Sequence, residues 1–264
     1  MDNLCTILVN SCDNYEDAWN PFFKLIKKYW KDRKYPIVLN TETKSYDFED
    51  LKIKTFSLYK NRDLSRVTWS HRMIETLNKI DSKYIIFMLD DFYLMDYVDN
   101  SKIDEIINWL ENDTNIAVFS FNVVEKNDYN DVDNNKYYGY ALRNKNGPYR
   151  FNCQAAIWRK DILIKTFRKH ESPWEWELIG NKRSERFNQE FYTVVDKKDM
   201  IFKYDCENVG IVRGKWRLPE TKIFFDKEGI YIDYSIRNDQ NHESVGKNLF
   251  KSIKTKFNRI KSLI

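Results

Sequence analysis

The sequence predicts an α/β fold with a mostly parallel central sheet flanked by helices. Short apolar runs rich in β-branched residues alternate along the chain with segments whose apolar residues recur at helical spacing. Of the 264 residues, 42% are hydrophobic and 16% are aromatic, which is enough to build a substantial core. Strand–helix alternation of this kind is typical of a parallel sheet whose faces are covered by helices.

The first third of the chain supplies the clearest elements. Residues 5–11, CTILVNS, form a β-branched apolar run that predicts a central strand, and residues 18–31 predict a helix with one apolar face. Residues 35–40 and 53–58 predict two further strands. Ser70 is the expected N-cap of the next helix.

The remaining elements follow the same alternation, with a looser middle. Residues 127–136 are rich in Asn and Asp and predict an exposed loop. The other expected strands cover residues 84–89, 116–121, 151–159 and 208–216, and the other expected helices lie near 103–110, from 161 onward and near 188–197.

Residue usage excludes two common ways of binding a ligand. The 7 glycines form neither a GxxxxGK[ST] nor a GxGxxG motif, so any phosphate must be held by side chains or by a metal. The 4 cysteines form no CxxC pair and the 3 histidines are scattered. Neither a structural zinc site nor a disulfide framework is therefore expected.

Basic residues are concentrated at the C-terminal end. The net charge is +4, and the six cations from Lys247 onward exceed it, so residues 1–246 carry a net charge of −2. A body this close to neutral is not expected to bind nucleic acid. We expect one domain over residues 1–237, followed by a polar hinge and a basic amphipathic helix within residues 238–264.

Residues 247–264 have apolar side chains at intervals of three or four, which places them on one helical face. The pairing of that face with six cations suits an interfacial helix on an anionic membrane, although the same helix can instead pack on the body. The N-terminal residues lack a leader pattern, and no run approaches the length of a membrane span. The expected location is cytoplasmic, at the inner face of the membrane if the tail docks there.

Two adjacent carboxylates, Asp90 and Asp91, follow directly after the apolar run that ends at Leu89. Ligands of open α/β sheets collect at the carboxyl ends of strands. Two acids there repel each other and lose hydration unless a cation neutralises them, and Mg²⁺ or Mn²⁺ prefers oxygen ligands. The alternative is a solvated turn that contains two acids.

Four segments, in this order, resemble those of GT-A-fold glycosyltransferases, family-2-like enzymes that bacteria use in surface polysaccharide biosynthesis. They are ILVNSCDNYED, FMLDDF, CQAAIWRKD and SPWEWE, and the resemblance extends from Thr6 to Trp216. It implies a nucleotide-sugar donor (a UDP-sugar is favoured), a glycan or lipid-linked acceptor, and Mn²⁺ or Mg²⁺ as cofactor. The family's usual motif is Asp-x-Asp, whereas Asp90 and Asp91 are adjacent. Either can be the metal ligand, and the other can meet the ribose.

The resemblance also implies donor-binding residues on both sides of the acidic pair. Ser11 and Asp13 lie where such enzymes contact the base, although Asp13 can instead be a loop cap and no residue selects uridine over guanosine or thymidine. Arg72 can reach the nucleotide or its phosphates, or can remain a solvated first-turn arginine. Arg213 and Lys215 flank a turn glycine where the GT-A fold often closes over the diphosphate; an ordinary surface turn is the alternative.

The segment HESPWEWELIG supplies the candidates for a general base. The resemblance places the base at Glu175, with Glu177 second, and a carboxylate packed between tryptophans would have a raised proton affinity. Glu171 is the third candidate, and all three acids can instead favour a helix N-terminus. Trp174 can stack on an acceptor sugar or pack in the core, and Gln154 can face the acceptor or be a satisfied buried amide.

The sequence leaves three classes of function open. The first is a metal-assisted glycosyltransferase of hexosyltransferase type, which inverts the anomeric centre if it follows the family it resembles. The second is a nucleotidyltransferase that makes a sugar nucleotide, although NSCDNYED has neither the glycine nor the basic residue usual in that class. The third is a non-catalytic module that binds carbohydrate or a membrane surface.

Overall fold

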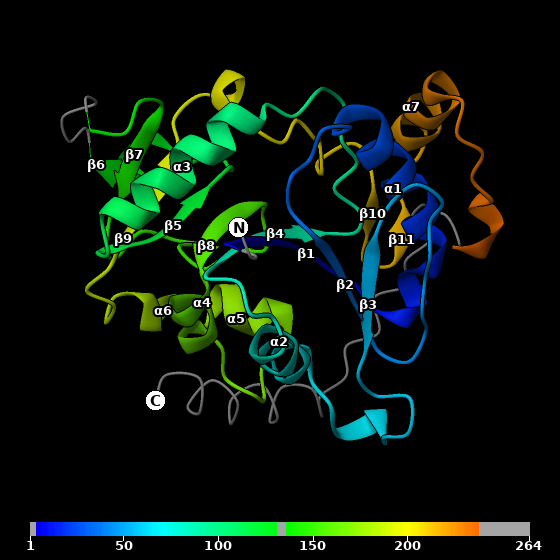
Figure 1. Ribbon diagram of the computed structural model, residues 1–264, viewed down its shortest axis with the longest axis horizontal. Coiled ribbons are helices and arrows are strands. Elements are labelled where there is room, and N and C mark those ends of the chain that lie inside the picture. Colours follow the sequence, from blue (N-terminus) through cyan, green and yellow to red (C-terminus); the bar gives the residue numbers. More distant parts are fainter. Residues whose placement is uncertain (1–3, 131–135, 238–264) are drawn as a thin grey trace, which may run out of the picture.

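The computed structural model describes residues 4–130 and 136–237 (Figure 1). Within these residues one nine-stranded sheet has the order β3-β2-β1-β4-β8-β5-β9-β7-β6. Strands β8 and β7 are antiparallel to both of their neighbours, so the other seven run in one direction. The strands are β1 (Cys5–Asn10), β2 (Ile37–Thr41), β3 (Ile53–Ser57), β4 (Tyr84–Leu89), β5 (Ile116–Ser120), β6 (Tyr129–Asn130), β7 (Tyr140–Arg143), β8 (Ala156–Arg159) and β9 (Glu190–Val194).

Helices cover both faces of the sheet, and almost every residue of its central strands is therefore buried. One hydrophobic cluster joins the sheet to α1, α3 and α7, and a second joins it to α2, α4 and α5 on the opposite face (Figure 1). The helices are α1 (Glu16–Tyr29), α2 (Trp69–Asn78), α3 (Asn100–Asn112), α4 (Lys160–Thr166), α5 (Pro173–Leu178), α6 (Asn181–Ser184) and α7 (Glu220–Glu228).

The predicted α/β fold class is confirmed: a mostly parallel central sheet is flanked by helices. Two local predictions are wrong. Thr68, not Ser70, caps α2, because its hydroxyl accepts a hydrogen bond from the N–H of His71. The helix expected near residues 188–197 is the strand β9, which is buried between β5 and β7. The predicted hinge and basic helix of residues 238–264 lie outside the described residues.

The register of the parallel strands brings their carboxyl ends to one edge. Asn10 of β1 pairs with Leu89 of β4 and with Asn40 of β2, so the residues that follow these strands emerge side by side. Strand β8 runs the other way and pairs Ala156 with Phe87 of β4. The residues that precede β8 therefore reach the edge at which β4 ends.

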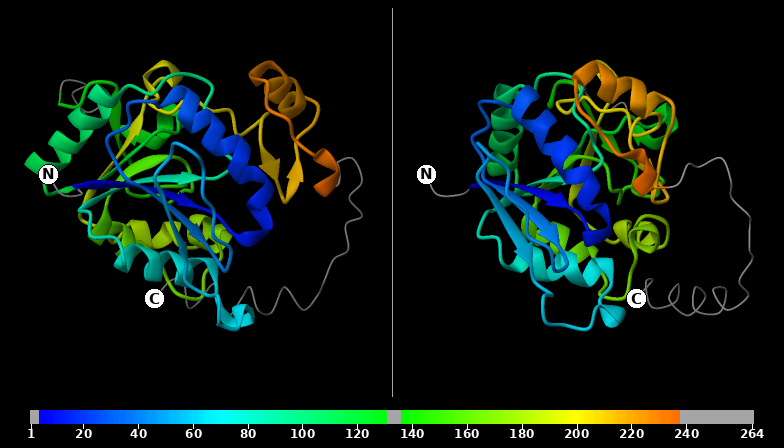
Figure 2. Two further views of the ribbon diagram at one scale, coloured as in Figure 1. Left: turned by 45° about the vertical axis from the view of Figure 1, so that its right-hand side comes forward. Right: turned by 90° about the vertical axis from the view of Figure 1, so that its right-hand side faces the viewer.

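A small hairpin stands beside this edge. It consists of β10 (Ile211–Val212) and β11 (Lys215–Trp216), and Figure 2 shows it next to α7 in the part of the molecule where β1 and β4 end. None of the helices that the structure describes is long and apolar enough to cross a membrane.

Candidate active site

Asp90 is buried directly beneath the sheet edge. The register that pairs Asn10 with Leu89 places Ser11 beside it, and the Ser11 hydroxyl donates a hydrogen bond to its Oδ2. The indole N–H of Trp19 in α1 donates in turn to the Ser11 hydroxyl over 2.6 Å. Burial, and then the neighbouring charge of Asp91, raise the pKa of Asp90. Asp90 is thus anchored inward, and Ser11 is its partner.

Asp91 is less deeply buried, and its carboxylate is less fully bonded. Its Oδ1 atom is shielded from solvent yet has no hydrogen-bond partner among the described residues. Burial raises the pKa of Asp91 to about 6, although the N–H of Ile211 and the charge of Arg237 favour the ionised form. A carboxylate oxygen left in this state is an available ligand position.

The β10–β11 hairpin approaches the acidic pair through a glycine. Gly210 has φ +134°, and a Cβ atom at this position would lie 3.2 Å from the carbonyl oxygen of Asp91. The conformation and the space both favour glycine here. Arg213 and Gly214 form the hairpin turn with positive φ angles, and Lys215 begins β11, so both cations flank the turn glycine.

Arg237 ties this hairpin to the loop after β1. Its guanidinium donates to the carbonyl oxygen of Gly214 over 3.1 Å and to that of Asn14 over 2.6 Å, and it pairs with Asp17 over 2.6 Å. It also lies over the ring of Tyr15, 4.3 Å from its centroid. Sequence reasoning missed Arg237, because its partners are more than 20 residues away along the chain.

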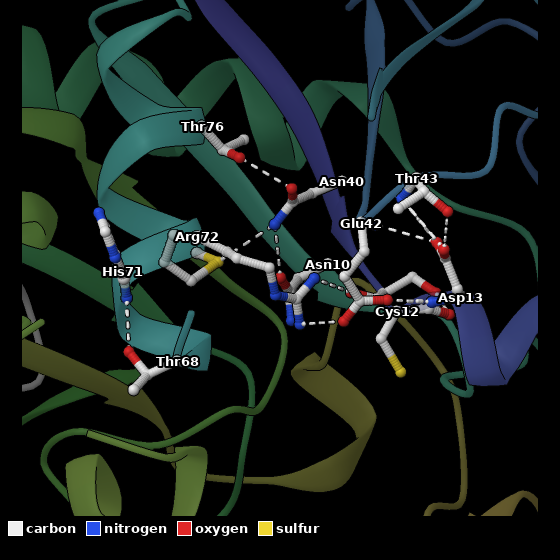
Figure 3. A network of polar contacts seen from close by, with 12 residues as sticks. Asn10, Cys12, Asp13, Asn40, Glu42, Thr43, Thr68, His71, Arg72 and Thr76 are labelled. Atoms are coloured by element: carbon white, nitrogen blue, oxygen red, sulfur yellow. Dashed lines mark hydrogen bonds and ion pairs between the residues drawn. The ribbon is translucent and has the colours of Figure 1, made fainter. Parts of the chain in front are cut away.

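A polar network connects the loops after β1 and β2 to α2 (Figure 3). Arg72 extends from α2, donates to the carbonyl oxygen of Ser11 over 2.8 Å and pairs with Glu42 over 3.4 Å. Asp13 accepts hydrogen bonds from the N–H groups of Glu42 and Thr43, each over 3.0 Å. Partial burial opposes ionisation of Asp13, but the hydrogen bonds, those from Thr43 foremost, lower its pKa. Arg72 and Asp13 both hold the shape of this loop.

A cavity of about 840 Å³ opens beside the segment that enters β8, and neither Asp90 nor Asp91 is part of its wall. Gln154, Glu177, Tyr204 and Cys206 contribute to its wall. The ring of Tyr204 stacks on Phe92, which follows Asp91 in the chain, at a centroid distance of 4.4 Å. The Asp91 charge raises the pKa of Tyr204 and of Cys206, in each case after the larger effect of burial. Asp91 and the cavity are therefore neighbours.

Glu177 presents its carboxylate to this cavity. It accepts a hydrogen bond from the N–H of Cys153 over 2.6 Å, which fixes it beside the chain that enters β8. Burial raises its pKa, and the bonds from Cys153 only partly oppose the rise. A carboxylate with raised proton affinity at a cavity wall has the properties of a general base.

Glu175 has a different place from Glu177. Its side chain accepts from the N–H of Ser172 over 2.8 Å while the Ser172 hydroxyl accepts from the N–H of Glu175, which is the reciprocal capping box that starts α5. The third acid of the segment, Glu171, is fully buried and pairs with Arg183 over 2.6 Å. Of the three acids, Glu177 is the one in the cavity wall.

Replacing Glu175 with alanine should lower the free energy of unfolding by about 1 kcal/mol, because one half of the capping box is lost. Turnover of the folded protein should change less than about threefold, since a base lost from the reaction would cost far more. Thermal unfolding and steady-state rates measured on one preparation check both parts. A 100-fold loss of turnover in a folded Glu175→Ala variant would indicate that Glu175, and not Glu177, is the general base.

Of the two predicted acceptor residues, Gln154 lines the cavity and Trp174 does not. Gln154 lies in the cavity wall, and its Oε1 atom accepts from the hydroxyl of Tyr204 over 2.9 Å. Trp174 is 65% exposed on α5 and is not part of the cavity wall, whereas Trp176 is buried and stacks on Phe151 and Phe167. Gln154 is therefore the better placed of the two for an acceptor.

The acidic pair fits a divalent cation as part of a shared site. No group of three or more His, Cys, Asp or Glu side chains within the described residues can hold a metal alone. The unpartnered oxygen of Asp91 is a hard oxygen ligand that a cation would satisfy. Mg²⁺ and Mn²⁺ commonly bind one or two carboxylates together with substrate phosphates and water, and Asp91 can supply one such carboxylate.

Comparison with known proteins finds similarity at the level of structure. No protein-family model matches the chain, and no curated protein matches it. The mannosyltransferase PcManGT from Pyrobaculum calidifontis, solved with GDP-Man and Mn²⁺, matches with a TM-score of 0.46 at 11% identity, over 73% of this chain and 54% of that one. S. aureus TarS 1-349 matches with a TM-score of 0.44 at 12% identity, over 72% of this chain and 60% of that one.

A third match is a cytidylyltransferase from Leptospira borgpetersenii, with a TM-score of 0.46 at 13% identity over 92% of this chain and 100% of that one. The chain thus spans less than two thirds of the first two structures and the whole length of the third. A mannosyltransferase and a cytidylyltransferase thus match with the same TM-score of 0.46.

Proposed function

We propose that the protein is a glycosyltransferase that moves a sugar from a nucleotide-diphosphate donor to an acceptor hydroxyl. One juxtaposition supports the proposal: Glu177, with its base-like carboxylate, lines the same cavity as Tyr204 and Cys206, and the charge of Asp91, whose Oδ1 has no hydrogen-bond partner among the described residues, reaches that cavity wall. Such a site can hold a leaving diphosphate at one end and deprotonate an acceptor at the other.

The donor half uses the loops after β1 and β4 together with the hairpin. Asp91 would hold Mg²⁺ or Mn²⁺ with the diphosphate, and Asp90, bonded to Ser11, fixes the turn that presents Asp91. The cation, when bound, stabilises the negative charge that grows on the leaving phosphate. Arg213 and Lys215 add positive charge at the hairpin turn, where it favours the same leaving group.

The acceptor half uses the cavity in front of β8. Glu177 takes the proton of the acceptor hydroxyl, the acceptor oxygen bonds to the anomeric carbon, and the bond from that carbon to the β-phosphate oxygen breaks. The nucleoside diphosphate leaves with the bonding electrons. One base and direct displacement give inversion of the anomeric centre, the stereochemistry of the family whose segments this sequence resembles.

A panel of UDP-, GDP- and dTDP-sugars tests the proposal. With Mn²⁺ present, at least one donor should release nucleoside diphosphate at a rate that increases when a glycan acceptor is added, and EDTA should abolish the release. Pyrophosphate release from a nucleoside triphosphate and a sugar phosphate would identify a nucleotidyltransferase instead. Binding of glycans with neither product would identify a non-catalytic module.

A further inference from the structure

Tyr149 stands at the cavity in an unusual conformation. It contributes to the cavity wall, its side chain is 48% exposed, and its φ angle is +52°. Few residues other than glycine adopt positive φ, and a bulky residue there costs stability unless the surroundings hold it. Because the Tyr149 ring is exposed, packing does not explain why a residue with this unfavourable φ angle is a tyrosine, and a function explains it better.

Buried polar groups hold the backbone around Tyr149. Arg143 is 4% exposed, and its guanidinium donates to the carbonyl oxygens of Pro148 and Tyr149. Asn152, also 4% exposed, donates to the carbonyl oxygen of Tyr149 over 2.9 Å. On the other side, Asn181 of α6 accepts from the N–H of Arg150 over 2.7 Å and donates to the carbonyl oxygen of Gly147 over 3.0 Å.

The cavity that this ring borders is acidic. Among the residues that the structure describes, its wall contains two basic residues, Arg143 and Lys197, and the first is buried against backbone carbonyls. The wall contains five acidic residues, which are Glu125, Asp128, Glu177, Asp205 and Glu207. A wall with this excess of carboxylates attracts cations and repels carboxylates and phosphates, and apolar walls would focus that field.

We propose that Tyr149 is the platform on which an acceptor sugar ring stacks, and that the acidic wall restricts this sugar to uncharged or amino-bearing residues. That the bound sugar is the acceptor rests on the proposed function. Binding of a sugar at Tyr149 can be measured without turnover. A tyrosine ring on a fixed backbone offers a large contact area at little cost in side-chain entropy, because only two side-chain torsions are ordered. The charge of the wall then excludes uronic acids and phosphorylated sugars at this position.

Saturation-transfer NMR with three methyl β-D-glycosides tests the charge selection. Methyl glucosaminide and methyl glucuronide each differ from methyl glucoside at one substituent. The wild-type protein should therefore bind the glucoside and the glucosaminide, and should bind the glucuronide about fivefold more weakly than the glucoside. Glu207→Lys should bring the glucuronide to within twofold of the glucoside, and raising the salt concentration should shrink the wild-type difference. Equal binding of all three, or of none, by the wild-type protein overturns the proposal.

Variants at Tyr149 test the platform in the same assay. Tyr149→Phe keeps the ring and should bind methyl glucoside as the wild type does, whereas Tyr149→Gly should bind it about tenfold more weakly. Glycine adopts φ +52° without strain, so the melting temperature of Tyr149→Gly should not fall, which excludes misfolding as the cause. Tyr231→Ala is the control, since Tyr231 is 85% exposed and is not part of the cavity wall.

Wild-type affinity in Tyr149→Gly overturns the role of the ring. The proposed function is judged separately, by nucleoside diphosphate release from the donor panel. A protein that binds the glycosides through Tyr149 but releases no nucleoside diphosphate contradicts the proposed function and leaves the sugar platform standing. In an active enzyme, the Tyr149→Gly loss should appear in the acceptor KM more than in kcat.

Discussion

Asp91→Asn should weaken Mn²⁺-dependent binding of UDP or GDP by roughly 100-fold or more. Removing a residue that merely supports a metal ligand already costs about 10–100-fold, so removing the charged ligand itself should cost at least as much. Asparagine keeps the shape of the side chain, and the free Oδ1 position of Asp91 means that no described hydrogen bond is lost there. Isothermal titration with and without Mn²⁺ measures the effect.

Asp90→Asn is the matched control for this experiment. Its carboxylate accepts from Ser11 beneath the edge, so the asparagine variant should mainly lose stability, with a smaller loss of metal-dependent binding. A larger binding loss in Asp90→Asn than in Asp91→Asn would exchange the two roles. Unchanged metal-dependent binding in both variants would contradict a metal site at this pair.

Glu177→Gln should lower turnover by about 10²–10⁴-fold, the usual contribution of a positioned general base. Glutamine can still accept the hydrogen bond from Cys153, so the variant should fold, and nucleotide affinity should be retained because the base acts on the acceptor. Rates under saturating donor and acceptor, with Glu175→Gln measured in parallel, check the assignment. Wild-type turnover in Glu177→Gln would sink it.

The pH dependence provides a second test of Glu177. The ionised carboxylate is the form that accepts a proton, and burial raises its pKa. Activity should therefore be complete at high pH and should fall, as pH decreases, at a value above the ordinary range of a glutamate near pH 4.3. The acid limb of kcat/KM should lose this transition in Glu177→Gln. A limb at the ordinary glutamate value would mean that another group controls it.

The first half of the fold could be predicted because most residues of its strands are apolar or β-branched. The expected strands at 5–11, 35–40, 53–58 and 84–89 correspond to β1 to β4 within about two residues at each end. Strand β9 was mistaken for a helix because a short apolar run does not distinguish the two, and its burial between β5 and β7 decides the matter. Helix α7 was not predicted, since Thr221 and Phe225 are its only buried residues.

Some residues of the candidate site could be predicted from the sequence, and others could be found only in the structure. Asp90, Asp91 and Ser11 could be grouped from sequence because they directly follow parallel strands, whose ends meet at one edge. The proposal of Glu177 rather than Glu175 as the base comes from the structure, because both follow Trp in the same short segment, and the capping box of Glu175 and the cavity-wall position of Glu177 are not visible in the sequence. Tyr149 carried only a weak signal, a Gly-Pro-Tyr turn, and its role depends on Arg143 and Asn152 holding that turn.

The antiparallel pairing of β8 with β4 has a consequence for how such a protein can change. In the proposed function, the donor residues Asp90 and Asp91 directly follow β4 and the acceptor residue Gln154 lies just before β8. Four residue pairs, from Tyr84–Arg159 to Phe87–Ala156, join these two strands. Because an antiparallel strand rises about 3.4 Å per residue, a two-residue slip would shift Gln154 by about 7 Å along β4. Loops on either side can therefore diverge between homologues without changing the distance between Gln154 and the acidic pair, whereas an insertion or deletion within β8 would change it.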